Sequence, residues 1–185
     1  MEKSKVIGFD IDGVLYPWHL YVYQDLYNSG EIDYTYDYFW KYISSSYSQE
    51  RWESILENFN FFRGDFYDGA SEMLNEYSNY YDIFYLTSRP EKAYQLTCEQ
   101  LDKYRFPNPD NLIITKNKVD VISDVQPDYF VEDNKKYISD LYDLTQVVAV
   151  KHPWNYSFFE KSRCMKILWI NHILELPKVV LLKGE

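Results

Sequence analysis

Five short apolar runs, each followed by polar residues, constrain the fold of this chain more than any other feature. The first run, Lys5–Phe9, stops at Asp10. A run that is apolar at consecutive positions, and not only at alternate ones, is typical of a parallel strand buried on both faces. The other four runs are Asp82–Leu86, Asn111–Ile114, Asp128–Val131 and Gln146–Val150, and a sixth candidate is Ile167–Ile170.

The segments between these runs carry apolar residues at helical spacing. They include Ala70, Met73, Leu74 and Tyr77; then Ala93, Leu96, Leu101 and Tyr104; and later Ile138, Leu141 and Tyr142. Strands that alternate with helices predict a doubly wound parallel α/β sheet with helices packed on it. A chain of 185 residues is long enough for one such domain with an insertion, and too short for two full catalytic domains.

The segment 16–63 breaks this alternation. It shows no convincing strand but three helical patterns, which cover Leu20 to Tyr27, Tyr34 to Tyr42 and Trp52 to Phe59. Of its 48 residues, 16 are aromatic, whereas the whole chain has 36 aromatic residues. We therefore predict a small aromatic-rich helical cap at 16–63, inserted after the first strand into a core formed by 1–15 and 64–185.

The net charge and the cysteine content restrict the kinds of partner that we expect this chain to bind. The chain has 29 acidic and 19 basic residues and a formal charge of -10, which disfavours binding of a nucleic-acid polymer. The two cysteines, Cys98 and Cys164, form neither a disulfide framework nor a CxxC metal pair. Because the N-terminus lacks a signal peptide and no run reaches membrane-spanning length, we expect a cytoplasmic protein without a membrane partner.

Polar residues follow four of the predicted strands at the point where each strand ends. In an open parallel sheet, ligands bind at the carboxyl ends of the strands, so these residues are expected to converge. Taken singly, some of them also fit turns or helix starts. The four groups are Asp10-Ile11-Asp12-Gly13, Thr87-Ser88-Arg89-Pro90, Thr115-Lys116-Asn117-Lys118 and Glu132-Asp133-Asn134.

In this order, the strand-end groups resemble the four motifs of the haloacid dehalogenase (HAD) superfamily of phosphohydrolases. The resemblance rests on Phe9-Asp10-Ile11-Asp12-Gly13-Val14, Thr87, a lysine and Glu132-Asp133, and it implies a HAD-like Rossmannoid core. The helical insert, Leu86–Pro90 and Thr115–Lys118 are similar to the 5′(3′)-deoxyribonucleotidase group. Two positions depart from the pattern: many relatives have threonine in place of Val14, and the deoxyribonucleotidases usually have aspartate in place of Glu132.

The resemblance implies a role for each acidic residue. Asp10 would attack phosphorus and form an aspartyl-phosphate. Asp12 would protonate the leaving oxygen and later activate the attacking water. A dianionic phosphate approaches such carboxylates only when a hard cation neutralises them, so Asp10, Asp133 and the carbonyl group of Asp12 are expected to hold Mg²⁺, with Glu132 binding through water.

Other residues are expected to bind the phosphate group. Thr87 can donate a hydrogen bond to a phosphoryl oxygen, and Ser88 and Arg89 follow it, although Arg89-Pro90 also fits a turn and helix start. The stabilising lysine is Lys118 or Lys116. We favour Lys118, because it would begin the next helix and its place resembles that of the family's lysine. His19, His152 and His172 lack metal-ligand spacing and are expected to be surface or core residues.

Most aromatic side chains of the insert are expected to form its core, because a small helical bundle needs bulky residues to bury enough surface. Trp18, which lies close to the catalytic loop, is expected to line the cleft and stack on a nucleobase. One of Tyr16, Phe39 and Trp40 is expected to join it.

These observations together predict a Mg²⁺-dependent phosphomonoester hydrolase that dephosphorylates nucleoside monophosphates, deoxynucleotides in particular. Two alternatives stay open. A phosphatase of sugar phosphates or other small metabolites would keep every catalytic residue and change only the cap contacts. A non-catalytic protein would use the acidic cleft to hold a metal ion or a nucleotide.

Overall fold

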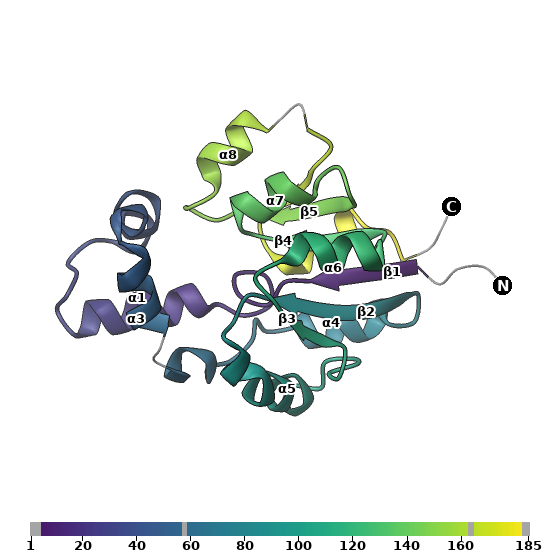
Figure 1. The fold of residues 1–185 in the computed structure, drawn as a ribbon, viewed down its shortest axis with the longest axis horizontal. Helices are drawn as coiled ribbons and strands as arrows, with labels where there is room; N and C mark the ends of the chain where they lie inside the picture. The colour runs from purple at the N-terminus through teal and green to yellow at the C-terminus, as the bar shows by residue number, and fades with distance from the viewer. Residues whose placement is uncertain (1–4, 57–58, 163–164, 183–185) are drawn as a thin grey trace.

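The computed structural model describes residues 5–56, 59–162 and 165–182, and its centre is a six-stranded parallel sheet (Figure 1). The strands lie side by side in the order β3-β2-β1-β4-β5-β6. All five predicted runs and the sixth candidate form strands, which confirms the predicted fold class. Their bounds are β1 Lys5–Phe9, β2 Tyr81–Thr87, β3 Leu112–Ile114, β4 Tyr129–Glu132, β5 Gln146–Val150 and β6 Leu168–Ile170.

Both faces of the sheet are buried, which explains why the strands read as continuous apolar runs. Ile7 pairs with Ile83 of β2 and with Tyr129 of β4, so β1 lies in the middle of the sheet. Its neighbour Gly8 faces Phe84 and Phe130, and a Cβ atom at Gly8 would lie 2.3 Å from the Phe84 ring. Glycine is therefore required where these two rings close over the central strand.

Helices cover each face of the sheet. One hydrophobic cluster joins the sheet to α4 (Ala70–Tyr77), α5 (Tyr94–Lys103) and the 3₁₀ helix η5 (Ile173–Lys178). A second cluster joins the opposite face to α6 (Lys118–Val125), α7 (Lys135–Leu141) and α8 (Tyr156–Lys161). A short 3₁₀ turn, η4 (Glu91–Ala93), precedes α5. The 3₁₀ helix η5 contains Pro177.

The segment between β1 and α4 is helical, as predicted, and it lies beyond the carboxyl end of β1 (Figure 1). Its own hydrophobic cluster includes Val22, Phe39, Trp40 and Ile55. The elements are α1 (Trp18–Asn28), α2 (Tyr36–Tyr38), the π-helix η1 (Phe39–Ile43), the 3₁₀ helix η2 (Ser44–Ser46), α3 (Gln49–Leu56) and the 3₁₀ helix η3 (Phe59–Phe62).

Two helical patterns of this insert differ from the prediction. The pattern from Tyr34 to Tyr42 is divided among α2, η1 and η2, because the backbone changes from α to π to 3₁₀ geometry. The pattern from Trp52 to Phe59 belongs to a helix that begins earlier, at Gln49, and extends to Leu56. Residues 57–58 of that pattern lie outside the described residues.

The hydroxyl group of Tyr16 links the beginning of the insert to its end. The buried Tyr16 hydroxyl donates a hydrogen bond to the carbonyl oxygen of Phe61 at 2.6 Å and accepts one from the backbone N–H of Gly64 at 2.7 Å. The two places where the chain passes between sheet and insert are thus held side by side. Within the described residues, no helix is long and apolar enough to cross a membrane.

Candidate active site

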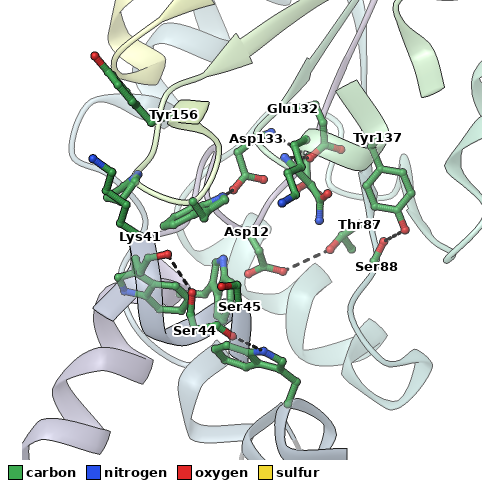
Figure 2. Close-up of a pocket in the computed structure, with 18 of the residues that line it drawn as sticks. Asp12, Lys41, Ser44, Ser45, Thr87, Ser88, Glu132, Asp133, Tyr137 and Tyr156 are labelled. Carbon is green, nitrogen blue, oxygen red and sulfur yellow. Dashed lines mark hydrogen bonds between the residues drawn. The ribbon is translucent and has the colours of Figure 1, made fainter. Parts of the chain in front are cut away.

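The strand-end groups converge at the carboxyl edge of the sheet, as the sequence predicts (Figure 2). Asp10 follows β1, Thr87 is the last residue of β2, and Glu132 is the last residue of β4. Lys118 is the first residue of α6, where the sequence placed it. All four side chains line one cavity while being at least nine-tenths buried. Charged groups this deeply buried need close partners.

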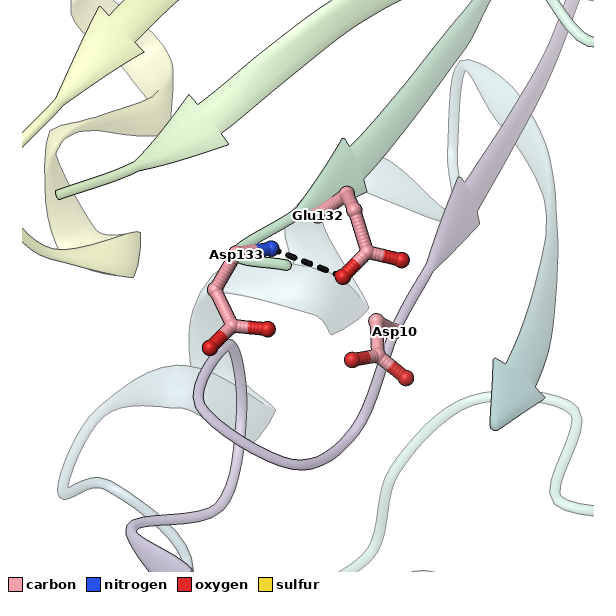
Figure 3. Close-up of side chains that lie close together, drawn as sticks. All are labelled: Asp10, Glu132 and Asp133. Carbon is pink, nitrogen blue, oxygen red and sulfur yellow. Dashed lines mark hydrogen bonds between the residues drawn. The ribbon is translucent and has the colours of Figure 1, made fainter. Parts of the chain in front are cut away.

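Three carboxyl groups form the acidic centre of the site. Asp10, Glu132 and Asp133 each place a carboxylate oxygen within 4.8 Å of the other two (Figure 3). They come from only two loops, because Glu132 and Asp133 are adjacent at the end of β4. Parallel pairing of β1 with β4, in which Phe9 faces Val131, sets the two loops side by side.

Lys118 balances part of this negative charge. Its Nζ lies 2.8 Å from Asp10 Oδ1 and 2.8 Å from Glu132 Oε2. The other oxygen of Glu132, Oε1, accepts hydrogen bonds from the backbone N–H groups of Asp133 and Asn134, each at 2.9 Å. Glu132 is therefore engaged on both oxygens by protein groups, and it orients Lys118 and the β4 loop.

Of the two lysine candidates, the structure brings only Lys118 to the carboxylates. The Lys116 side chain is exposed and is not among the residues that line the cavity. Its backbone carbonyl instead accepts a hydrogen bond from the Tyr137 hydroxyl at 3.1 Å. The same hydroxyl lies 3.1 Å from the Ser88 hydroxyl, which places Ser88 at the cavity wall beside Thr87 (Figure 2).

The electrostatics of the site favour an added cation. Burial raises the pKa of Asp10 to about 8, with Glu132 and Asp12 adding to the effect and Lys118 opposing it. Burial also raises the pKa of Asp133 well above its usual value. Burial alone would lower the pKa of Lys118, but Asp10 and Glu132 outweigh it and raise that pKa. The raised pKa values mean that Asp10 and Asp133 favour their protonated forms without a cation. Oxygen donors of this kind fit Mg²⁺, which would take the place of those protons.

Asp12 points to a different partner from the acidic centre. Arg89 Nε donates to Asp12 Oδ2 at 2.8 Å, and Arg89 Nη2 donates to Asp12 Oδ1 at 2.7 Å. The Thr87 hydroxyl also lies 3.4 Å from Asp12 Oδ2, a long contact. The Asp12 side chain is 19% exposed at the cavity, so it remains accessible to a ligand there.

Arg89, a sequence candidate for phosphate binding, is engaged by protein groups on all three guanidinium nitrogens. The third nitrogen, Nη1, donates to the Thr97 hydroxyl at 3.1 Å. The guanidinium carbon lies 4.9 Å from the centroid of the Tyr16 ring and 4.7 Å from that of Phe62. The side chain is fully buried, so a bidentate ion pair with Asp12 is its main contact with the site.

The cavity has a volume of about 800 Å³ and two contrasting walls. Carboxylates and Lys118 form the wall at the sheet. Tryptophans form the other: Trp18, Trp40 and Trp52 from the insert and Trp154 from the loop after β5. Trp40 and Trp52 stack with centroids 5.8 Å apart, and Trp18 meets Trp40 edge-on at 5.3 Å. We call these four residues the tryptophan wall.

Trp18 lines the cavity, as predicted, and of the three further aromatic candidates it is Trp40 that joins it. Tyr16 and Phe39 are fully buried, Tyr16 in the main core and Phe39 in the core of the insert. Neither is among the residues that line the cavity.

Sequence reasoning missed the loop after β5, residues 151–155. His152 and His19, which seemed scattered in the sequence, lie with their rings 4.9 Å apart, and Trp154 contacts His19 as well. Burial lowers the pKa of His152 to about 4 and that of His19 to about 2, so both rings are neutral at pH 7. The sequence does contain a signal for this loop, because the fifth apolar run is also followed by polar residues at this edge of the sheet.

Comparison with known proteins identifies the fold. No protein-family model and no curated protein matches the chain. A crystal structure of a dehalogenase aligns over 100% of both chains with a TM-score of 0.60 and 15% identity. The β-phosphoglucomutase of Clostridium difficile aligns over 94% of this chain and 93% of its own, with a TM-score of 0.53 and 15% identity.

A third neighbour was solved with a metal ion. It is described as a HAD-hydrolase from Bacillus subtilis bound to magnesium, and it aligns over 96% of this chain and 99% of its own. The TM-score is 0.57 and the identity 12%. The chain thus has the α/β fold of the HAD-like hydrolases. Because the identities are this low, the likeness establishes the fold, and the chemistry has to be argued from the site itself.

Proposed function

We propose that this chain is a Mg²⁺-dependent phosphomonoester hydrolase that acts through an aspartyl-phosphate on Asp10. One observation carries the proposal. Asp10 lies at the floor of an open cavity with Lys118 at 2.8 Å, two further carboxyl groups beside it, and Asp12 exposed to the same cavity. A nucleophile, a cationic stabiliser and a separate acid are what phosphomonoester hydrolysis by covalent catalysis needs.

Each residue has a definite task in this mechanism. An oxygen of Asp10 attacks phosphorus, and the bond to the leaving oxygen breaks with its electron pair going to that oxygen, which takes a proton from Asp12. To carry that proton, Asp12 has to free one carboxylate oxygen from its ion pair with Arg89. Water then attacks the aspartyl-phosphate and gives a proton back to Asp12, which releases inorganic phosphate and free Asp10. The Lys118 ammonium and the Thr87 hydroxyl stabilise charge on the phosphoryl oxygens.

The metal ion would be held by Asp10, Asp133 and the carbonyl group of Asp12, with Glu132 contributing through water. When bound, it would offset the charge that otherwise repels a phosphate dianion from three carboxylates. Support comes from the donor set, which is made of oxygen atoms only, and from the raised pKa values of Asp10 and Asp133. The magnesium-bound neighbour from Bacillus subtilis is consistent with this choice of ion.

We infer that the substrate is a nucleoside monophosphate, deoxynucleotides being favoured. The tryptophan wall supports this choice, because it places flat aromatic surfaces in the same cavity as the carboxylates, and nucleobases stack on such surfaces. The volume of about 800 Å³ lies within the usual range for small-molecule sites. A sugar phosphate would use the same carboxylates but would gain little from a wall of indole rings.

A substrate panel tests this proposal. Phosphate release from deoxynucleoside monophosphates, ribonucleoside monophosphates and sugar phosphates would be measured side by side, with Mg²⁺ and with excess chelator. We expect activity only with Mg²⁺ and the highest kcat/KM for nucleotides. A preference for sugar phosphates would replace the nucleotide assignment. The absence of turnover with every phosphomonoester in Mg²⁺ would refute the enzyme assignment and favour a binding protein.

A further inference from the structure

The loop after β5, residues 151–155, contacts both loops that carry the acidic centre. His152 Nε2 donates to the carbonyl oxygen of Gly13 at 2.7 Å. Trp154 Nε1 donates to Asp133 Oδ2 at 3.1 Å, and Asn155 Nδ2 donates to the backbone carbonyl of Asp133 at 2.7 Å. This short loop therefore holds the turn after Asp12 and both the backbone and the side chain of Asp133.

The loop itself is rigidly held. Asn155 is fully buried, and its amide group also donates to the carbonyl of Val150 at 2.8 Å while accepting from the backbone N–H of His152 at 2.9 Å. Because a carbonyl oxygen only accepts, the bond to Gly13 places the proton of the neutral His152 ring on Nε2. Every polar group named here has a defined donor or acceptor role.

Asp133 Oδ2 is enclosed by the protein. Gly13 adopts a φ of +87°, and a Cβ atom there would lie 2.3 Å from this oxygen. Only glycine allows this close approach of the catalytic loop to Asp133. Since Trp154 donates to the same oxygen, Oδ1 is the oxygen that a cation would use. Figure 3 shows one carboxylate oxygen of Asp133 turned toward Asp10 and the other turned away from it.

The Trp154 ring is fixed from two sides. It stacks on His152 with centroids 4.2 Å apart and planes 9° apart. It also contacts Trp40 of the insert at 5.2 Å, with planes 61° apart. A ring held in this way directs its N–H at one point, in contrast to a side chain that rotates freely.

We propose that Trp154 is a positioning residue for the metal ion, whose indole N–H fixes the carboxylate of Asp133 in the orientation that binds the cation. This inference rests on the proposed function, in which Asp133 is a metal ligand. Hydrogen bonds to a liganding carboxylate orient it, and their loss typically weakens metal binding by about 10- to 100-fold. The same ring belongs to the tryptophan wall, so metal ion and substrate leaving group share one neighbour.

The test compares two matched substitutions by calorimetric titration of substrate-free protein with Mg²⁺. Trp154→Phe keeps a ring against His152 and Trp40 but removes the N–H, and we expect its Mg²⁺ Kd to rise about 10- to 100-fold. Trp52→Phe makes the same change in the wall, where the indole N–H donates to the carbonyl of Ser44 at 3.2 Å. The Kd of this control should stay within about twofold of the wild-type value.

Two results would overturn the inference: a wild-type Kd in Trp154→Phe, or equal weakening in both variants, which would assign the effect to ring packing. If Trp154→Phe fails to fold, the wild-type protein gives a second measurement. In a ¹⁵N-labelled sample the chain has five indole N–H signals, one for each tryptophan. The assigned Trp154 signal should shift on addition of Mg²⁺ by more than that of Trp52, and an unmoved Trp154 signal would refute the role.

These measurements separate the inference from the proposed function, because none of them uses turnover. A wild-type protein that binds Mg²⁺ but hydrolyses no phosphomonoester refutes the hydrolase and leaves the Trp154 comparison valid. A wild-type hydrolase whose Trp154→Phe variant binds Mg²⁺ normally refutes only the role of Trp154. Failure of the wild-type protein to bind Mg²⁺ overturns both.

Discussion

The sheet and the helical insert hold their functional groups in different ways. At the sheet, parallel backbone pairing fixes β1 between β2 and β4, and the buried Lys118 holds the carboxyl group of Asp10 at the end of β1. In the insert, short helices of three geometries are held together by contacts between rings, such as Trp18 with Trp40 and Trp40 with Trp52. A buried charged group needs a partner held at a fixed distance. Aromatic rings, in contrast, can pack on one another where the backbone is irregular.

This difference divides the proposed function between the two regions. Under the proposed function, the sheet edge would supply the groups that make or break a bond to phosphorus, and the insert would supply three of the four tryptophans expected to meet the leaving group. Substitutions at the sheet edge should therefore reduce turnover of all phosphomonoesters, while substitutions in the insert should change the ranking of substrates.

Removing the nucleophile is expected to have the largest effect. Asp10→Asn should lower kcat by at least about 10⁴ on every substrate, because an amide cannot form the aspartyl-phosphate. Phosphate release and the thermal unfolding midpoint Tm would be measured together. Asp25→Asn, an exposed position in α1 of the insert, is the matched control and should retain full activity. Residual turnover of a nucleotide near the wild-type rate would exclude Asp10 as nucleophile.

Asp12→Asn should reduce the turnover of different substrates to different extents, depending on their leaving groups. It keeps the nucleophile but removes the acid and base, so turnover of a nucleotide should fall by roughly 10² to 10⁴. With p-nitrophenyl phosphate, whose leaving group hardly needs a proton, we expect a burst of p-nitrophenol stoichiometric with enzyme, followed by slow release of phosphate. If there is no burst and both substrates lose the same fraction of activity, Asp12 has another role.

The two lysines near β3 provide a matched pair at the sheet edge. Lys118→Met should lower kcat by about 10²- to 10³-fold on all substrates, because it removes the positive charge beside Asp10. Lys116→Met should have little effect, because the side chain is exposed and only its backbone carbonyl contacts the site. Steady-state kinetics of both variants decides between them, and the reverse order would restore Lys116 as the stabilising lysine.

Trp18→Ala should act on substrate choice. Loss of a stacking partner is expected to cost about 1 to 3 kcal/mol of transition-state binding on nucleotides. Turnover of p-nitrophenyl phosphate should fall much less. The ratio of the two kcat/KM values is the measurement, and an unchanged ratio would mean that Trp18 serves the structure of the insert or the catalytic loop.

The last expected effect concerns stability and not turnover, and it is a pH dependence of unfolding in metal-free protein. Folded Asp10 keeps its proton up to a pKa of about 8, whereas the unfolded chain loses it near 3.8. Unfolding therefore releases this proton between those values, and the free energy of unfolding should decrease as the pH rises through that window, by at most about 1.4 kcal/mol per pH unit for one proton.

Tm measured from pH 7 to pH 8 in chelator checks this dependence. Below about pH 6.5 the buried His19 and His152, whose pKa values are lowered, add a slope of the opposite sign. Asp10→Asn should make the profile shallower, and the slope that remains belongs to Asp133, whose pKa burial also raises. Mg²⁺ should flatten the profile, while Trp18→Ala should keep the slope of the wild-type protein. A slope that persists unchanged in Asp10→Asn would assign the titration to another group.

The same contrast explains what the sequence could predict. Strands buried on both faces leave continuous apolar runs, and parallel strands place their carboxyl ends together, so the convergence of Asp10, Thr87, Lys118 and Asp133 follows from local pattern and topology alone. These strand-end residues could be placed together in this way without any knowledge of side-chain conformations. The roles of the acidic residues and the choice of Lys118 over Lys116 also depended on the resemblance to the HAD superfamily.

The contacts that were missed depend on tertiary packing between distant segments. Arg89 turns to Asp12 because its guanidinium is enclosed by Tyr16 and Phe62, and no local pattern records that enclosure. The bond between His152 and Gly13 joins residues 139 positions apart. The change from α to π geometry at Phe39 likewise reflects how rings pack in the insert, which helical spacing does not encode.

The hydrogen bonds of the Tyr16 hydroxyl also bear on how the chain folds. Pairing of β1 with β2 must bring Ile7 to Ile83, and most of the sequence between them lies between Tyr16 and Gly64. Once the phenol joins Phe61 and Gly64, that stretch becomes a closed side loop, and the remaining loop that β1 and β2 must close is short. Because the entropy of loop closure grows only slowly with length, residues added within the insert should hardly slow the formation of the sheet.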